Sequence, residues 1–302
     1  VAGHTDDGGN ADESITINKL ASGGTVAVTA TIGLAADDDG VVVAVTDAAT
    51  GAADVLNVVV SGAAAVDAGT VAAASVETIN VTSTNSGITP GIAHLLEISD
   101  AAVTTMTAAG NAGLNLTLNA NVVALTSLDG SAITGALVAS TNGTVAQTII
   151  GGSAGDTLTA SGTSDILNGG AGNDTLIAGN LAQLTGGDGV DTFNMTALTT
   201  NVNSYASILD ASSGDIIKAN AGAFKAAQIT LAPTAVFQDF ANAAANTSTA
   251  NNDLLWFQFS GNTYIIQDAA TGGAAYDETA DTIIQLTGLV DLSTASYSAA
   301  NG

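Results

Sequence analysis

Short runs of apolar and β-branched residues, each broken by a turn, dominate the first hundred residues of the chain. Apolar positions within a run tend to alternate with polar ones, and clusters of Gly, Asp and Ser separate the runs. A period of two is typical of strands with one buried face, whereas such clusters mark turns. We therefore expect an all-β region over residues 1–100, either sandwich-like or an irregular solenoid. The runs are SITINKL (14–20), TVAVTATIGL (25–34), VVVAV (41–45), DVLNVVV (54–60) and VETINVT (76–82).

The pattern changes further along the chain. Residues 101–145 keep short apolar strands between Gly, Asn and Asp turns, which predicts a short-strand β-solenoid region. In FQDFANAAAN (237–246), Phe237, Phe240 and two alanines recur at helical spacing, so we expect a short helix that faces the core. The segment WFQFSGNTYIIQD (256–268) alternates around a Ser-Gly-Asn turn, which predicts a hairpin. The C-terminal part is thus expected to be a β-rich cap with one short helix.

From Gly151 the sequence follows a nine-residue period. Two complete units, GGAGNDTLI (169–177) and GGDGVDTFN (186–194), accompany the degraded units GGSAGDTLT (151–159) and ASGTSDILN (160–168) and the eight-residue AGNLAQLT (178–185). The sixth position holds Asp156, Asp165, Asp174 and Asp191, and the eighth holds Leu158, Leu167, Leu176 and Phe193. This is the nonapeptide G-G-x-G-x-D-x-U-x, the calcium-binding repeat of RTX proteins. The alternative, a set of ordinary tight turns, is less favoured because such turns keep no fixed period.

The period determines which aspartates stack. If each nonapeptide is a six-residue turn and a three-residue strand of a flattened right-handed helix, residues eighteen apart lie above one another. Asp156 and Asp174 then share one edge, and Asp191 continues it despite the one-residue deletion. Calcium prefers six to eight oxygen ligands, so it can bind two such carboxylates and backbone carbonyls between stacked turns. The sequence therefore predicts calcium sites along this edge.

Two other acidic groups are weaker candidates. Asp165 lies on the opposite edge, near Ala182 or Gln183, where the eight-residue unit has no aspartate. We expect at most one weak calcium site there. The run DDDG (37–40) offers three carboxylates, but a solvated turn is the favoured interpretation.

The charge balance restricts the possible partners. Three lysines and no arginine stand against 28 acidic residues, and the formal net charge is −25. Nucleic acids and anionic membranes bind clustered basic side chains, so the expected partners are soluble cations, with no nucleic acid and no direct membrane insertion. The chain begins with Val1 rather than Met. We interpret it as a processed product or as one end of a larger protein.

The residue types also restrict the chemistry. All eleven aromatic residues follow Asp191, so the core before it must be built from aliphatic side chains, which suits thin stacked sheets. The absence of cysteine excludes disulfides, zinc thiolates and a cysteine nucleophile. His4 and His94 are isolated, and the sequence has no nucleophile elbow or P-loop motif. We therefore expect no enzymatic activity.

The nonapeptides and their flanks together resemble the C-terminal part of an RTX-type bacterial surface-layer (S-layer) protein that is exported by type I secretion. The resemblance covers most of residues 69–297. Besides the repeats it rests on GTVAAASVETINVTSTN (69–85), GNAGLNLT (110–117), LTSLDGSAITG (125–135), ILDASSGDIIKAN (208–220), LLWFQFSGNTYIIQD (254–268) and DTIIQLTGLVDLSTASY (281–297). It implies a β-rich lattice region (1–100), the short-strand solenoid region (101–145), a calcium-binding parallel β-roll (146–195) and a C-terminal cap with the secretion region (196–302).

The resemblance also implies a ligand set. Carbonyls from the first and third positions of one turn and the second and fourth positions of the next would complete each calcium site. They belong to Gly151, Ser153, Gly169, Gly170, Ala171, Gly172, Gly187 and Gly189. In relatives the segment with Asp210 and Asp215 caps the last coil, and contact of one of them with calcium stays open. Ala154 replaces the usual fourth-position glycine of the first repeat, which predicts an altered turn.

The function implied by the resemblance is structural. The chain would be a subunit of a calcium-dependent S-layer, a two-dimensional lattice of identical subunits on the outside of a bacterial cell. A part of the parent protein beyond this chain would bind a cell-surface polysaccharide. The alternative is a C-terminal calcium-binding and secretion module of a secreted RTX adhesin or hydrolase.

Overall fold

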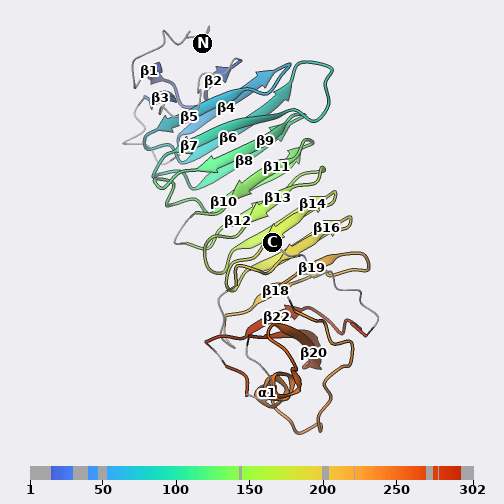
Figure 1. Ribbon diagram of the computed structural model, residues 1–302. Helices are drawn as coiled ribbons and strands as arrows, with labels where there is room; N and C mark the ends of the chain where they lie inside the picture. Colours follow the sequence, from blue (N-terminus) through green and yellow to red (C-terminus); the bar gives the residue numbers. More distant parts are fainter. Residues whose placement is uncertain are drawn as a thin grey trace.

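The computed structural model describes residues 15–29, 40–46, 53–142, 145–198, 204–220, 222–269, 275–277 and 279–293. This part of the chain is mostly β with one short helix, and it contains no helix with the length and hydrophobicity that a bilayer crossing needs. Its strands form two long sheets (Figure 1). The first contains, in spatial order, β1 (Ile15–Leu20), β3 (Gly40–Val45), β5 (Asp67–Ala73), β7 (Ala93–Ser99), β9 (Gly113–Leu118), β11 (Leu137–Ser140), β13 (Thr157–Thr159), β15 (Thr175–Ile177), β17 (Thr192–Asn194) and β19 (Ile216–Lys218). The second contains β2 (Gly24–Val28), β4 (Val55–Gly62), β6 (Thr78–Asn85), β8 (Thr105–Gly110), β10 (Ser127–Ile133), β12 (Thr148–Ile150), β14 (Ile166–Ala171), β16 (Gln183–Asp188), β18 (Ala206–Ile208), β22 (Thr282–Leu286), β21 (Asn262–Asp268) and β20 (Asp253–Phe259).

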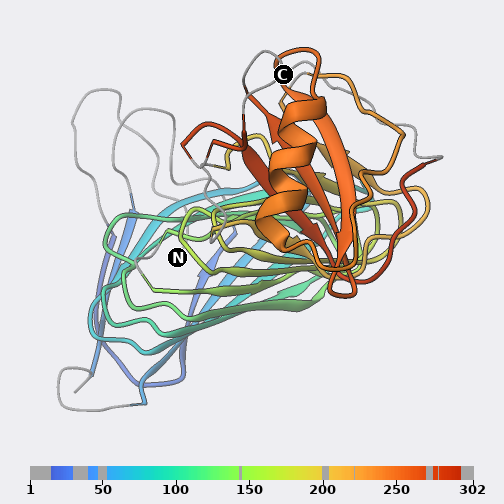
Figure 2. The same ribbon diagram turned by 90° about the horizontal axis from the view of Figure 1, so that it is seen from below.

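Successive strands alternate between the two sheets, so each coil of the chain contributes one strand to each. Neighbouring strands from β1 to β19 pair in parallel within both sheets. The result is a parallel β-solenoid whose coils stack along one axis (Figure 1) and overlie one another when seen from its end (Figure 2). The predicted all-β fold is confirmed. Of the two arrangements expected for residues 1–100, the described strands adopt the solenoid.

The number of residues in a coil varies along the axis. Thr157 pairs with Thr175, eighteen residues on, and Thr175 pairs with Thr192, seventeen residues on, as the nonapeptide period and its deletion predict. Further upstream Thr78 pairs with Thr105, twenty-seven residues on, because both the strands and the turns of that coil are longer; β6 and β7 have eight and seven residues, whereas β13 and β14 have three and six. Parallel strand pairs in both sheets also cross the positions near 100 and 145 where the sequence suggests divisions, so both sheets are continuous there.

The interior of the solenoid is built from aliphatic side chains stacked coil upon coil. The eighth-position residues of the repeats, Leu158, Leu167, Leu176 and Phe193, are all fully buried, as expected. In the second sheet the strand register aligns one buried side chain from each coil directly with that of the next coil, so that these side chains form a continuous row in the interior. It consists of Leu56, Ile79, Met106, Leu128, Ile149, Leu167, Leu184 and Ile208.

The C-terminal part covers the last coil with a different arrangement. Strand β22 pairs in parallel with β18, and β21 and β20 follow as an antiparallel hairpin. Helix α1 (Phe237–Thr247) lies across this hairpin, where Phe240 stacks on Phe257 with ring centroids 5.2 Å apart (Figure 2). The predicted hairpin and the predicted core-facing helix are both confirmed.

Candidate metal centre

Asp156, Asp174 and Asp191 lie above one another on the edge where the second sheet turns into the first; we call them the aspartate ladder. Oδ1 of Asp174 accepts the backbone N–H of Asp156 (2.7 Å), and Oδ1 of Asp191 accepts that of Asp174 (2.9 Å). The same bond continues beyond the ladder at both ends. Asp156 accepts the N–H of Leu137 (2.7 Å), and Asp215 accepts the N–H of Asp191 (2.9 Å). Each carboxylate therefore joins its coil to the preceding one.

The ladder concentrates negative charge in a buried place. Asp156, Asp174 and Asp191 are no more than 2% exposed. Burial, together with the charges of Asp156 and Asp191, raises the pKa of Asp174 to about 7, although the hydrogen bond from Asp156 N–H opposes the rise. Burial likewise raises the pKa of Asp156 and of Asp191 above their ordinary values. The stack of carboxylates thus favours either a bound proton or a bound cation.

One carboxylate oxygen of the ladder has no hydrogen-bond partner. Oδ2 of Asp174 is buried and unpaired, and it lies over the backbone of Gly169, the first glycine of its own repeat. A methyl group on Gly169 would overlap both this oxygen and the carbonyl oxygen of Gly186 from the next coil. The missing side chain of Gly169 therefore leaves two oxygens facing the same small space. Such a pair of hard oxygens is suited to a hard cation such as calcium.

The first repeat has a different turn. Gly170 and Gly187, the second glycines of the two complete repeats, have φ of +101° and +97°. In the first repeat, where Ala154 replaces the fourth-position glycine, Gly152 is not in this conformation, and its N–H donates to Oδ2 of Asp156 at 2.5 Å. The fourth-position glycines of the complete repeats, Gly172 and Gly189, also have positive φ (+119° and +146°), a conformation that alanine disfavours. The altered turn predicted from Ala154 is therefore observed, and it satisfies an oxygen that is unpaired at Asp174.

The carbonyls expected to bind calcium lie on three consecutive turns of this edge. Gly151 and Ser153 are on the first, Gly169, Gly170, Ala171 and Gly172 on the second, and Gly187 and Gly189 on the third. The last two turns meet backbone to backbone, because methyl groups on Gly187 and Gly189 would overlap the carbonyl oxygens of Gly170 and Gly172. The expected set does not include Gly186, whose carbonyl faces Asp174 Oδ2. Gly186 is the first residue of a complete repeat, and this position could have identified it as a ligand.

Asp165 lies on the opposite edge and is fully engaged. The register of β14 and β16 places it beside Ala182. Its Oδ1 accepts the N–H of Gln147 (2.9 Å), and its Oδ2 accepts Thr141 Oγ1–H (2.7 Å) and Gly162 N–H (2.9 Å). A carboxylate with three donors has little need of a cation. Asp165 therefore serves as a cap for neighbouring backbone amides.

Other acidic residues at the end of the repeats act in the same way. Asp210 accepts the N–H groups of Gly186 and Gly187 (both 2.9 Å), and Asp215 accepts that of Ser212 in addition to Asp191. These bonds cap the last repeat turn. The run DDDG has only its glycine within the described residues, and His4 lies outside them.

His94 takes the place of an aspartate further up the same edge. Its ring is fully buried, Nδ1 accepts the N–H of Val66 (3.0 Å), and Nε2 lies 3.1 Å from the carbonyl oxygen of Thr84. Nε2 then donates to the carbonyl of Thr84 while Nδ1 accepts, so both ring nitrogens have a backbone partner. His94 therefore has a structural role that its isolation in the sequence did not reveal.

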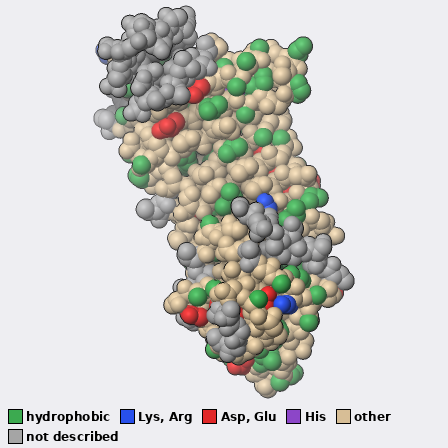
Figure 3. All heavy atoms as spheres, viewed as in Figure 1, with side chains coloured by type: hydrophobic (Ala, Val, Ile, Leu, Met, Phe, Trp, Pro, Cys, Tyr) green, Lys and Arg blue, Asp and Glu red, His purple; other side chains and the backbone are tan. Residues whose placement is uncertain are grey.

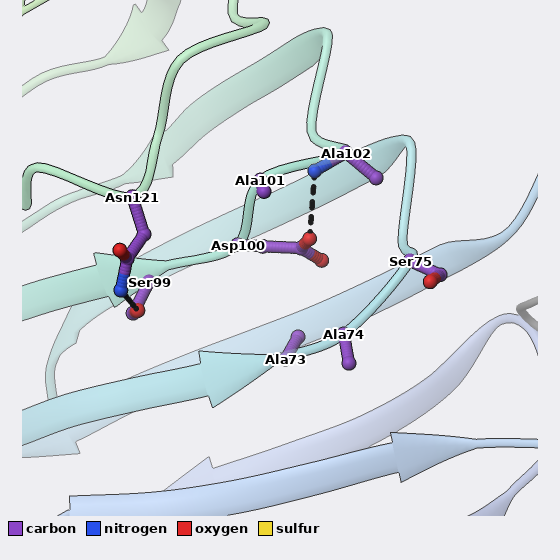
Figure 4. Close-up of a pocket in the computed structure, with 8 residues that line it drawn as sticks. All are labelled: Ala73, Ala74, Ser75, Ser99, Asp100, Ala101, Ala102 and Asn121. Carbon is purple, nitrogen blue, oxygen red and sulfur yellow. Dashed lines mark hydrogen bonds between the residues drawn. The ribbon is translucent and has the colours of Figure 1, made fainter.

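A shallow cavity of about 450 Å³ opens on the other edge, between the coils of β5, β7 and β9 (Figure 4). Asp100 is its acidic residue, and its carboxylate accepts the N–H groups of Ala102 and Val76 (both 2.9 Å). Burial raises the pKa of Asp100, although these hydrogen bonds oppose the rise. Asp100 is thus another cap. The cavity is lined by Ala73, Ala74, Ser75, Ser99, Asp100, Ala101, Ala102 and Asn121.

The aspartate ladder is therefore the place where the described residues best fit a cation. They contain no group of three acidic or histidine side chains that converge as a ready-made metal cluster. A cation here would be held by Asp174, a neighbouring ladder carboxylate and carbonyls such as that of Gly186. Calcium would supply positive charge between the stacked turns. No protein-family model matches the chain, and no curated protein matches it.

The pKa of Asp174 predicts how stability depends on pH in calcium-free buffer. Unfolded aspartate has a pKa near 3.9, so between about pH 4 and 7 the folded protein holds a proton that the unfolded chain lacks. The free energy of unfolding should therefore fall as the pH rises through this window, by on the order of 4 kcal/mol for Asp174. Urea unfolding at several pH values with chelator measures the slope. Asp174→Asn should flatten it; an equal slope in both proteins would contradict the assignment.

Proposed function

We propose that the chain is a structural subunit of a calcium-dependent bacterial surface layer, in which it assembles with identical subunits into a two-dimensional lattice outside the cell. The observation that carries the proposal is the aspartate ladder on turns of the sequence GGxGxD, with the buried, unpaired oxygen of Asp174 facing the carbonyl of Gly186. Calcium bound there would neutralise the ladder and lock successive coils together. In this proposal the segment from Gly151 to Asn194 is an RTX calcium roll, and the protein reaches the cell surface by type I secretion.

The outer surface of the solenoid supports a role in assembly. The molecule is elongated, and the visible face carries only scattered acidic and basic side chains, with hydrophobic side chains spread among the uncharged remainder (Figures 1 and 3). On the first sheet, Leu95, Val138 and Ile216 are each about 40% exposed, at 41, 42 and 38%. Apolar side chains on a regular sheet offer contact area to a second subunit. Repeated contacts that do not close into a ring produce an extended array.

We propose no catalytic activity for this chain. The buried carboxyl groups on the edges of the solenoid, at Asp100, Asp156 and Asp165, accept hydrogen bonds from backbone amides of neighbouring coils. Such bonds hold turns in place, and they engage the oxygens that acid–base chemistry would require.

Assembly under controlled calcium tests the proposal. Purified protein should be monomeric in chelator, because subunits that each carry a charge of −25 repel one another. It should form planar arrays at millimolar calcium, which is the concentration range in which extracellular calcium modules bind the ion. Light scattering and negative-stain electron microscopy measure this, and chelator should reverse it. Asp174→Asn should require more calcium, whereas Asp165→Asn should assemble like the wild type. A monomer at all calcium concentrations would favour a secretion module of an RTX adhesin or hydrolase.

A further inference from the structure

Three aspartates form a buried row at one end of the cap sheet, away from the aspartate ladder. Asp253 begins β20 and pairs directly with Asp268, the last residue of β21. The pairing of Gln267 with Thr282 places Asp281 opposite Asp268 on the third strand. Directly opposed residues of antiparallel strands project from the same face, with Cβ atoms about 5 Å apart. The exposed fractions of the three residues are 0, 2 and 1%, so three carboxyl groups share one buried surface.

Both carboxylate oxygens of Asp281 accept a backbone hydrogen bond. Its Oδ1 accepts the N–H of Ala269 (2.9 Å), and its Oδ2 accepts that of Asp277 (2.8 Å). Its carboxyl group is also hydrogen-bonded to that of Asp268; burial and this neighbour raise the pKa of Asp281. Asp281 therefore holds Asp268 in position.

Asp253 is charged and only half satisfied. Its Oδ2 accepts the N–H groups of Thr249 (2.8 Å) and Ala250 (3.0 Å) and lies 3.1 Å from Nζ of Lys225. Burial raises its pKa, but these donors outweigh burial and hold the pKa below its ordinary value. Its Oδ1 is buried without a hydrogen-bond partner. An unpaired buried oxygen of a charged group is strongly unfavourable, so Oδ1 is suited to a cation.

The end of α1 adds negative potential at the same place. The helix ends at Thr247, and the residues that follow it, Thr249 and Ala250, are the backbone donors to Asp253. No basic residue lies in its last turn. The C-terminus of a helix carries a partial negative charge and presents carbonyl oxygens. Three carboxyl groups beside it, with Lys225 as the neighbouring cation, form a site that attracts positive charge.

We infer that the cap contains a second cation site, in which Oδ1 of Asp253 and the carboxylate of Asp268 bind a hard divalent cation such as calcium. The described residues contain no three acidic side chains close enough to form a ready-made metal cluster, so backbone oxygens or water complete the coordination. The site uses none of the residues of the aspartate ladder and does not depend on the function proposed above. It would fasten the hairpin to the end of α1.

The position of the aromatic residues allows a test that reads the cap alone. Trp256 lies three residues after Asp253, and the hydroxyl of Tyr276 is 3.5 Å from the carbonyl oxygen of Asp281. The chain before Phe193 has no aromatic residue. Terbium, a hard ion that also binds oxygen ligands, emits strongly when a nearby Trp or Tyr transfers its excitation. Sensitised terbium emission should therefore report binding beside Asp253.

We expect the wild-type protein to show sensitised emission that calcium displaces. Asp253→Asn and Asp268→Asn should each weaken terbium binding at least tenfold, whereas Asp174→Asn in the ladder and Asp277→Asn beside the row should leave it within twofold. Trp256 fluorescence and circular dichroism verify that each variant is folded. Absence of emission from the wild type, or its loss in Asp174→Asn, would overturn the inference. A folded Asp253→Asn protein with undiminished emission would also overturn it and leave Asp268 and Asp281 as a proton-sharing pair only.

Discussion

Saturating calcium should raise the free energy of unfolding of the solenoid by about 3 kcal/mol for each occupied ladder site, measured by urea unfolding against a chelator control. This is the stabilisation expected when calcium is about a hundred times above its dissociation constant. The physical source is Asp174, whose Oδ2 is buried and unpaired and whose charge is opposed by Asp156 and Asp191. Magnesium should stabilise much less, because it requires a smaller octahedral site and gives up its water reluctantly.

Two conservative variants separate a cation site from a structural cap. Asp174→Asn should abolish most of the calcium increment, because it removes a charged ligand from the site. Asp165→Asn should lower stability in calcium and in chelator by the same amount, because its carboxylate accepts hydrogen bonds from Gln147, Thr141 and Gly162. Its calcium increment should therefore stay close to that of the wild type. Equal increments for both variants would mean that the two edges bind calcium alike.

The repeats were readable from the sequence because their turns and strands have constant length. A fixed period states directly that Thr157, Thr175 and Thr192 stack, and the register confirms it. The upstream coils belong to the same solenoid, but their strands and turns differ in length. Thr78 and Thr105 stack across twenty-seven residues, so no repeat marks the pairing. The alternation of apolar and polar residues identified most of those strands. The pairing of the strands depends on contacts between distant residues, which a single sequence does not show.

The candidate site was partly predictable for the same reason. The period places Asp156, Asp174 and Asp191 on one edge, but it does not state that each carboxylate accepts the backbone N–H of the preceding coil. That bond explains why His94, with a ring nitrogen as acceptor, can occupy an equivalent place. No sequence motif marks the row of buried aspartates in the cap, because only the pairing of three strands brings these residues together.

Replacing Gly187 by alanine should lower the free energy of unfolding by about 3–5 kcal/mol, the range of substitutions that both strain the backbone and displace packed atoms. Gly187 has a φ of +97°, a conformation that alanine rarely adopts. A methyl group there would also overlap the carbonyl oxygen of Gly170 in the preceding coil, with which it pairs. The two coils must then separate next to the point where the Gly186 carbonyl faces Asp174. The calcium increment should fall together with the stability.

Gly261→Ala is the matched control for this prediction. Gly261 has a similar φ of +85° in the turn between β20 and β21, but a methyl group would find no atom within 4 Å. Its cost should be limited to backbone strain, about 1–2 kcal/mol, with the calcium increment of the ladder unchanged. Urea unfolding followed by circular dichroism for the solenoid and by Trp256 fluorescence for the cap measures both. An equal decrease in the free energy of unfolding for the two variants would contradict this prediction. The close contact between successive glycine turns would then contribute nothing, and backbone strain alone would account for the cost of replacing Gly187.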